Sequence, residues 1–271
     1  MQDLREQSES SREIPLADKC AIVTGASRGI GRAIALSLAQ LGANIVVTAR
    51  DINKLNNVAA SIRKERRQVH VAPGDLRDPG FPSQLVDSAL TTFGNIDILV
   101  NSAGATRRGN FIDMTIEDWT DGFALKFFGA ALLCQRAWPH LARRKGSIVN
   151  IAGTGGRTPD ADFTVGGPVN AALLSFTKAL AEVGITDGVQ VNCVNPGLIR
   201  TDRLVGRIAA ASKKWGLSDG EASERMLKEF RITRFGDPED VGALVGFIVS
   251  PCGRLFHGSL IDIDGGWTKT I

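Results

Sequence analysis

The chain alternates short apolar runs with longer segments in which apolar residues recur every three or four positions. The first apolar run covers residues 20–23, and a turn containing Gly25, Gly29 and Gly31 follows it. Residues 32–41 then carry apolar side chains at helical spacing. A continuous apolar run is typical of a strand buried on both faces, and the spacing after it indicates an amphipathic helix. The first unit is therefore predicted to be strand, turn and helix.

The same alternation continues to the end of the chain. Further strands are expected at 44–48, 69–73, 96–100, 147–151, 189–194 and 260–263, and helices at 53–67, 82–93, 116–144, 170–183 and 238–249. Such alternation without a change of composition predicts one α/β domain over residues 18–271. Its expected fold is a doubly wound parallel sheet of about seven strands with helices on both faces. Residues 1–17 are polar and aperiodic, and are expected to form a disordered arm.

Composition excludes several classes of function. The net charge of +3 is small and its basic residues are scattered, so neither nucleic acid nor a membrane surface is an expected partner. No apolar run approaches the length of a membrane span, and the polar start of the chain is unlike a secretory signal. The four cysteines stand far apart without a CxxC pair, which predicts no metal site and favours a reducing, cytoplasmic location.

The glycine turn carries the first functional signal. Strand, glycine turn and helix form the unit that binds dinucleotides, because the turn lets the backbone approach a pyrophosphate. Backbone N–H groups at the start of the helix then face the phosphates. The alternative is a tight turn that holds no ligand. Because ligands of such sheets lie beyond the carboxyl ends of the strands, the site is expected from residues 25–31, 49–51, 74–76, 101–109, 152–168 and 195–203.

Several motifs then occur in a fixed order. They are Thr24-Gly25-Ala26-Ser27-Arg28-Gly29-Ile30-Gly31, Asp75, Asn101-Ser102-Ala103-Gly104, Asn195-Pro196-Gly197 with Thr201, and Asp264-Gly265-Gly266. On these motifs, residues 18–268 resemble the short-chain dehydrogenase/reductases. The resemblance implies a Rossmann-like fold, a nicotinamide cofactor, and oxidoreduction of a small carbonyl or alcohol substrate covered by the charged, helical and mobile segment 200–236.

The resemblance also implies which residues contact the cofactor. Those expected at its phosphates, adenine end and nicotinamide end are Gly25, Ser27, Arg28, Gly29, Ile30, Gly31, Arg50, Asp75, Leu76, Asn101, Ala103, Gly104, Pro196, Gly197, Ile199 and Thr201. Asp75 is expected at the adenine ring, and Asn101 is expected both to flank the adenine ribose and to stabilise the sheet.

The choice between NAD and NADP depends on the end of the second strand. An NAD enzyme places a carboxylate there to accept from the ribose 2′-OH. Here Ala49 takes that position, Arg50 follows it, and Arg28 lies in the glycine turn. Two guanidinium groups suit a 2′-phosphate, so NADP(H) is the expected cofactor, with Asp51 pointing away. The alternative is that both arginines are solvated surface residues.

The chain contains no tyrosine, which conflicts with the chemistry that the resemblance implies. The family uses a tyrosine, a lysine four residues later, an upstream serine, and an asparagine on the long helix. By position these correspond to Gly166, Asn170, Gly153 and Lys126. The family has asparagine at the first of these helix positions and lysine at the second, whereas this chain has Lys126 and Asn170, so the two residue types are exchanged. Lys126 is therefore expected to hold the cofactor ribose or to donate a proton. An ordinary solvated lysine is the alternative.

The glycine at position 166 is also expected to enlarge the pocket by the volume of a phenol ring. A bulky substrate, water or an inward loop could fill that space. Asp160 and Asp162 are candidates for an acid or for turn formers. Arg107 and Arg108 could receive a carboxylate or phosphate of a substrate, or lie solvated in their loop.

Three functions remain open at this point. They are an NADP(H)-dependent oxidoreductase with a non-standard proton donor, an inactive NADP(H)-binding sensor or regulatory protein, and a lyase- or isomerase-type enzyme on the same scaffold. The resemblance further implies a homotetramer, or a dimer, assembled through the helices at 116–144 and 170–183.

Overall fold

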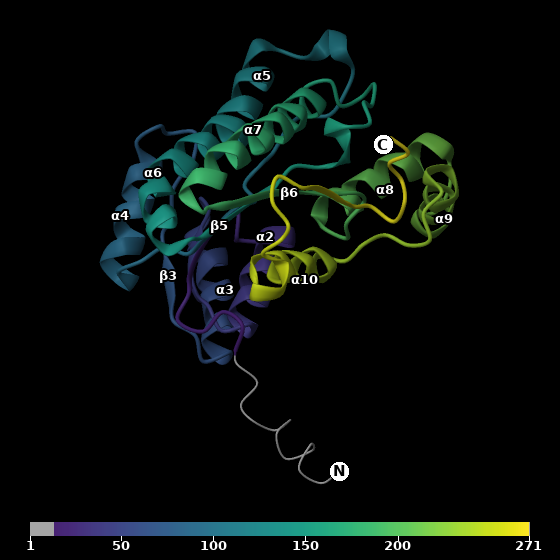
Figure 1. Cartoon of the computed structure of the whole chain (residues 1–271). Helices are drawn as coiled ribbons and strands as arrows, with labels where there is room; N and C mark the ends of the chain where they lie inside the picture. The colour runs from purple at the N-terminus through teal and green to yellow at the C-terminus, as the bar shows by residue number, and fades with distance from the viewer. Residues whose placement is uncertain (1–13, 271) are drawn as a thin grey trace, which may run out of the picture.

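The computed structural model describes residues 14–270 (Figure 1). Its centre is a seven-stranded sheet in the order β3-β2-β1-β4-β5-β6-β7, with every neighbouring pair parallel. The strands are β1 (Cys20–Thr24), β2 (Asn44–Thr48), β3 (Val69–Val71), β4 (Ile98–Asn101), β5 (Ser147–Ile151), β6 (Gln190–Pro196) and β7 (Leu260–Ile263). The predicted α/β class with a doubly wound parallel sheet is confirmed.

Helices cover both faces of the sheet (Figure 1). One face carries α2 (Gly29–Gln40), α3 (Ile52–Lys64) and α10 (Pro238–Val249), and the other carries α4 (Phe81–Phe93), α6 (Gly129–Arg144) and α7 (Gly166–Asp187). Each face has its own buried apolar cluster, one including Ile34 of α2 and the other Leu133 of α6. All five residues of β1 are buried, which agrees with a central strand packed on both sides.

The order of strands reverses between β1 and β4, and this reversal positions the site. The segments that follow these two strands lead to opposite faces of the sheet, so a crevice opens between them. Thr24 fixes the two segments together, because its Oγ1 accepts hydrogen bonds from the backbone N–H groups of Ser102 and Ala103, each at 3.0 Å. The crevice therefore has rigid walls.

The long helix expected at 116–144 is divided into three pieces. A helix α5 (Ile116–Phe123) and α6 are joined by one π-helical turn, Ala124–Phe128. The π-turn contains Lys126, and such turns are frequent at functional sites. Hydrophobic spacing alone does not reveal the π-turn. Over only five residues, an α-helix and a π-helix produce similar patterns of apolar positions.

The arm expected over residues 1–17 has a different boundary. Residues 1–13 lie outside the described part of the chain. Residues 14–17 are not the disordered end that was expected: Leu16 is 2% exposed within the core cluster, and its N–H donates to the Leu41 carbonyl at 2.9 Å. Burial of one leucine is enough to hold this short turn against the domain.

The segment 200–236 forms two helices, α8 (Asp202–Trp215) and α9 (Asp219–Phe230), which confirms its predicted helical character. They lie together at one end of the molecule, close to the C-terminus (Figure 1). A small cluster of its own, including Leu204, Met226 and Phe235, holds them. Among residues 14–270, no helix combines the length and apolar character needed to cross a bilayer.

Candidate active site

A cleft of about 1540 Å³ opens at the carboxyl ends of the strands. All six segments expected to form the site line it, including the glycine turn, the loop after β4 and the start of α8. Of the residues expected to contact the cofactor, all line this cleft except Asn101. The residues predicted to contact a cofactor are therefore gathered around one cleft.

The glycine turn forms a backbone cradle that side chains would fill. Gly25 has a φ of +65°, and a Cβ there would lie 2.9 Å from the Cα of Ala103. A Cβ on Gly31 would lie 2.4 Å from the carbonyl oxygen of Gly25. Gly29 has a φ of +52° and faces Thr201, with only 3.1 Å between its ideal Cβ and the Thr201 methyl group. These positions need glycine for conformation and for space.

The N-terminus of α2 faces this cradle without a cap. Its N-cap residue, Arg28, makes no side-chain capping bond, and no acidic residue lies in the first turn. By contrast, α3, α5 and α9 each begin with a carboxylate or hydroxyl that accepts from the helix backbone. Free N–H groups beside a glycine cradle are the features that bind a phosphate. The residues present therefore fit the pyrophosphate of a dinucleotide.

Arg28 and Arg50 both line the cleft. Arg50 Nη1 lies 3.9 Å from Asp75 Oδ2, and Arg28 Nη1 donates to Asp202 at 2.7 Å. Both arginines are more than 60% exposed, so these pairs are weak and open to exchange for a phosphate. Asp51 caps α3 by accepting from the N–H of Lys54 at 3.1 Å, as expected of a carboxylate turned away from Arg50.

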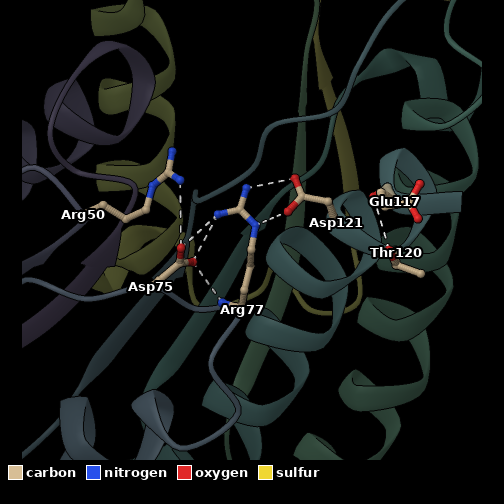
Figure 2. A network of polar contacts seen from close by, with 6 residues as sticks. All are labelled: Arg50, Asp75, Arg77, Glu117, Thr120 and Asp121. Carbon is tan, nitrogen blue, oxygen red and sulfur yellow. Dashed lines mark hydrogen bonds and ion pairs between the residues drawn. The ribbon is translucent and has the colours of Figure 1, made fainter. Parts of the chain in front are cut away.

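Asp75 is oriented by a second arginine that the sequence did not single out (Figure 2). Arg77 lies between Asp75 and Asp121, with its Nη1 3.1 Å from one Asp75 oxygen and its Nη2 2.9 Å from Asp121 Oδ2. The Arg77 N–H also donates to Asp75 at 3.0 Å. Asp121 belongs to α5, so the loop after β3 is attached to the helix that leads to Lys126.

Asn101 differs from the other residues of the expected cofactor set, because it does not line the cleft. Its side chain is 4% exposed and lies beneath the cleft, where Nδ2 donates to Asn150 Oδ1 at 2.9 Å. Asn150 in turn donates to Thr177 Oγ1 at 2.9 Å, linking β4, β5 and α7. The expected role in the sheet agrees with this contact, but the side chain does not border the cleft.

Lys126 reaches into the cleft from the π-turn. Its Nζ donates to the Ala152 carbonyl at 2.7 Å and to Asn170 Oδ1 at 2.6 Å. Its carbon chain lies against Gly104, where an added Cβ would come within 2.9 Å of the lysine Cδ. Burial, followed by the positive charge of Arg203, lowers the pKa of Lys126 to about 7. The expected contact between Lys126 and Asn170 is therefore present.

The space expected beside Gly166 is filled. A Cβ on Gly166 would lie 2.0 Å from Phe163 Cζ, and one on Gly155 would lie 2.9 Å from Phe163 Cδ1. The Phe163 ring therefore occupies the place that a side chain of residue 166 would take. Gly166 itself is buried and does not line the cleft, whereas Gly153 does, beside the Asn170 amide. Of the three alternatives expected for the space beside Gly166, the structure shows the inward loop, whose Phe163 ring fills it.

The remaining candidate side chains, the arginines and aspartates of the loops, form ion pairs within the protein. Arg107 donates to Asp118 at 2.7 Å, and Arg108 bonds both Asp160 and Asp162. Burial opposes ionisation of Asp160, but the hydrogen bond and charge of Arg108 outweigh it, so the pKa of Asp160 is lowered. An aspartate with a lowered pKa is a poor acid at neutral pH, and both arginines pair with carboxylates of the chain.

Comparisons with known proteins agree with this geometry. The family model described as enoyl-(acyl carrier protein) reductase matches residues 25–268. Human dehydrogenase/reductase SDR family member 4 is 32% identical over 266 residues, covering 96% of this chain and 91% of its own. The chain belongs to the short-chain dehydrogenase/reductase family.

Other members of the short-chain dehydrogenase/reductase family extend the comparison. The NADPH-dependent reductase BacG of Bacillus subtilis is 30% identical over 259 residues, covering 94% of this chain and all of its own. The solved structure of L-sorbose reductase from Gluconobacter frateurii, complexed with NADPH and L-sorbose, is 31% identical with a TM-score of 0.90, covering 96% of this chain and 100% of that one.

This short-chain dehydrogenase/reductase has cleft residues that were not singled out from the sequence, although two of them lie in the expected segments 152–168 and 195–203. They are Phe163, Arg203 and Arg207, all of which line the cleft. Phe163 gave no signal, because a lone aromatic residue in a glycine-rich loop has no pattern. Arg203 and Arg207 did give one, since they stand four residues apart just after Thr201. Among residues 14–270, no group of three or more His, Cys, Asp or Glu side chains could ligate a metal.

Proposed function

We propose that this protein is an NADPH-dependent carbonyl reductase in which Lys126 donates the proton. The cofactor half of the proposal is supported by the glycine cradle, the uncapped start of α2, and the exposed guanidinium groups of Arg28 and Arg50. It is supported further by relatives that are named as NADPH-dependent or were solved with NADPH. NADPH, when bound, supplies the hydride that a carbonyl carbon accepts.

The observation that carries the catalytic half is the position of Lys126. Its amine lies in the cleft on neutral acceptors, the Ala152 carbonyl and the Asn170 amide. It forms no ion pair with any of the residues that the structure describes. A lysine with a pKa near 7 can both give and take a proton at neutral pH, which is the requirement for a general acid.

In this proposal each group has a separate task. Lys126 gives a proton to the carbonyl oxygen as the carbon is reduced, so the product is an alcohol and the amine is left neutral. Asn170 Oδ1 and the Ala152 carbonyl hold the ammonium in place before transfer. Solvent at the cleft then returns a proton to the amine. Phe163 excludes water from the side of the pocket above Gly166.

The alternative is an inactive NADP(H)-binding sensor or regulatory protein. It is favoured by the lack of tyrosine and by Phe163, which takes the place of a side chain at position 166. Both functions need the same cofactor cradle, so cofactor binding does not separate them. Transfer of hydrogen to a carbonyl compound does.

The first test is calorimetric titration with NADPH and with NADH. NADPH is expected to bind at least about ten-fold more tightly, because two guanidiniums can pair with its 2′-phosphate. Arg50→Met should reduce that preference, whereas Arg63→Met, on the exposed side of α3, should not. Equal affinity for both cofactors would contradict the assignment of Arg50.

The second test follows the transfer of a hydrogen atom from NADPH to a carbonyl compound. Stereospecifically deuterated NADPH is mixed with a panel of neutral ketones and aldehydes, including methyl benzoylformate and ethyl acetoacetate, and mass spectrometry detects deuterium in the alcohol. Stereospecific transfer to any of them supports the reductase. Tight NADPH binding without transfer to a broad panel overturns it in favour of the sensor.

We further propose an assembly through α7 and the α5–α6 helix, as a homotetramer or a dimer. Ala171, Ser175, Ala179 and Val183 of α7 are all exposed and stand four residues apart, on one side of the helix. Small side chains let two helices approach closely. A cytoplasmic location is proposed as well, because all four cysteines are unpaired, which suits a reducing compartment.

A further inference from the structure

Two arginines of α8 face the cleft beside Lys126. Arg203 and Arg207 are one helical turn apart, and both line the cleft. The Arg203 guanidinium donates to the Gly104 carbonyl on the opposite wall. Since the Lys126 carbon chain lies against the same Gly104, Arg203 and Lys126 meet at one point of the cleft.

Neither arginine has an acidic partner. No carboxylate of residues 14–270 lies within ion-pair distance of Arg203 or Arg207, whereas Arg28 and Arg200 pair with aspartates at 2.7 and 3.2 Å. Desolvation, followed by the charge of Arg28, lowers the pKa of Arg203; for Arg207, desolvation is followed by the charge of Arg108. The cleft therefore holds guanidinium charges that the chain itself does not neutralise by contact.

The acidic groups nearest to Arg207 are already engaged. Asp160 and Asp162 both bond to Arg108, which lies between them and stacks on Phe163 with 4.1 Å from its Cζ to the ring centroid. The two acidic residues of α8 and α9 that line the cleft are engaged as well, Asp202 with Arg28 at 2.7 Å and Glu229 with Arg225 at 2.9 Å. The guanidiniums of Arg203 and Arg207 and the Lys126 amine are left without a carboxylate of their own. Positive charge is in excess beside the predicted proton donor.

An apolar wall lies next to these charges. The Arg207 Cζ lies 5.8 Å from the centroid of the Phe230 ring, and Phe230 packs edge-on against Trp267 at 4.6 Å. Met226 lines the same part of the cleft. A ligand with an apolar body and one anionic group matches this surface. Arg207 is partly buried and Arg203 is exposed at the mouth of the cleft. A partly buried cation without an acidic partner costs stability, so Arg207 points to a ligand that supplies the missing charge.

We propose that Arg203 and Arg207 bind the anionic group of the substrate, so that the protein reduces carbonyl compounds carrying a carboxylate or a phosphate. The proposal rests on the proposed function, because it names the substrate class of that site. Arg207 is placed to pair with the anion against Phe230, and Arg203 to hold it on the side of Lys126. The carbonyl then lies between the anion site and the amine.

The cofactor is a second possible source of the anion, since Arg203 lies near Arg28 at the cradle. The experiment separates the two sources by measuring binding without turnover. Protein saturated with NADP⁺ is titrated calorimetrically with benzoylformate, an aryl keto acid, and with its methyl ester, which has the same ring and ketone but no charge. NADPH affinity is measured separately on each variant.

Wild-type protein is expected to bind the acid about ten-fold or more tightly than the ester, the scale of one charge-assisted hydrogen bond. Arg207→Met should remove that preference and leave the affinities for the ester and for NADPH within about two-fold. Lys213→Met is the matched control, because it removes one charge from the exposed side of the same helix and should change none of these values.

Three results would overturn the proposal. They are equal binding of acid and ester by wild-type protein, an equal loss of both in Arg207→Met, and a loss of NADPH affinity in Arg203→Met and Arg207→Met with the acid preference retained. The last result assigns the anion site to the cofactor. Selective binding of benzoylformate without reduction of any carbonyl would keep the anion site and reject the reductase, so the two failures are distinguishable.

Discussion

The amine of Lys126 titrates near neutral pH because its neighbours satisfy its hydrogen bonds without neutralising its charge. A carbonyl and an amide oxygen accept from it, at 2.7 and 2.6 Å, but neither is an anion. Desolvation is therefore uncompensated, and Arg203 adds repulsion. A carboxylate at the position of Asn170 would have produced an ordinary ion pair and a permanently charged lysine.

The pH dependence of the reaction follows from this residue. In the proposed mechanism the protonated amine is the donor, and its pKa is about 7. With methyl benzoylformate as substrate, kcat/KM is expected to be highest below this pH and to fall by about ten-fold per unit above it. Lys126→Met should lower the rate by ~10²–10⁴-fold and remove the step from the profile.

The pH prediction has its own control. Lys126→Met removes a buried charge, so its thermal denaturation is measured to show that the variant is folded. A variant that keeps the wild-type rate and the wild-type pH profile would exclude Lys126 as the donor.

At the scale of elements, α8 and α9 form a cap that is held more weakly than the sheet. Their cluster around Leu204, Met226 and Phe235 is separate from the two clusters that bury the faces of the sheet. Arg203 and Arg207 belong to this cap. Lys126 belongs to the π-turn between α5 and α6. The two halves of the proposed substrate site therefore have different expected stabilities.

Hydrogen exchange tests this difference. Backbone amides of α8 and α9 should exchange at least about ten-fold faster than those of β1, β4 and β5, because opening the cap exposes little of the main core. NADP⁺ together with benzoylformate should slow the cap further than NADP⁺ alone, since the anion joins Arg207 to the opposite wall. Exchange in the cap as slow as in β4 would show that it opens only with the whole domain.

At the scale of the molecule, one side of α7 has no partner in the described chain. Its exposed row of small residues suits a second copy, and it lies on the helix that also carries Asn170. Assembly through α7 would therefore support the helix that holds Lys126 in place.

Sedimentation measures this assembly. Ala179→Arg places a long charged side chain in the middle of the row and should lower the molecular mass in solution to that of a smaller species. Lys228→Ala, an exposed change on α9, should leave the mass unchanged. Identical masses for wild-type protein and Ala179→Arg would remove α7 from the proposed interface.

Features encoded by neighbouring residues were predictable, and those set by contacts between distant segments were not. The apolar run at β1 and the glycines after it predicted the strand, the cradle and the location of the cleft. The contact between Lys126 and Asn170 was predicted from the family resemblance. Neither the π-turn nor the position of Phe163 has a local signature, because each depends on how α7 packs against the loop before it. The pairing of Arg108 with Asp160 and Asp162 is hidden for the same reason.

The Phe163 ring over Gly166 also restricts which sequences this protein can reach by mutation. A tyrosine introduced at position 166 would meet a ring that already stands 2.0 Å from its first side-chain atom. Replacing Phe163 first would open a cavity above Gly155, which is unfavourable on its own. The two positions are thus epistatic, each change being acceptable only in the presence of the other. A side chain at position 166 is therefore most readily accommodated when position 163 changes with it.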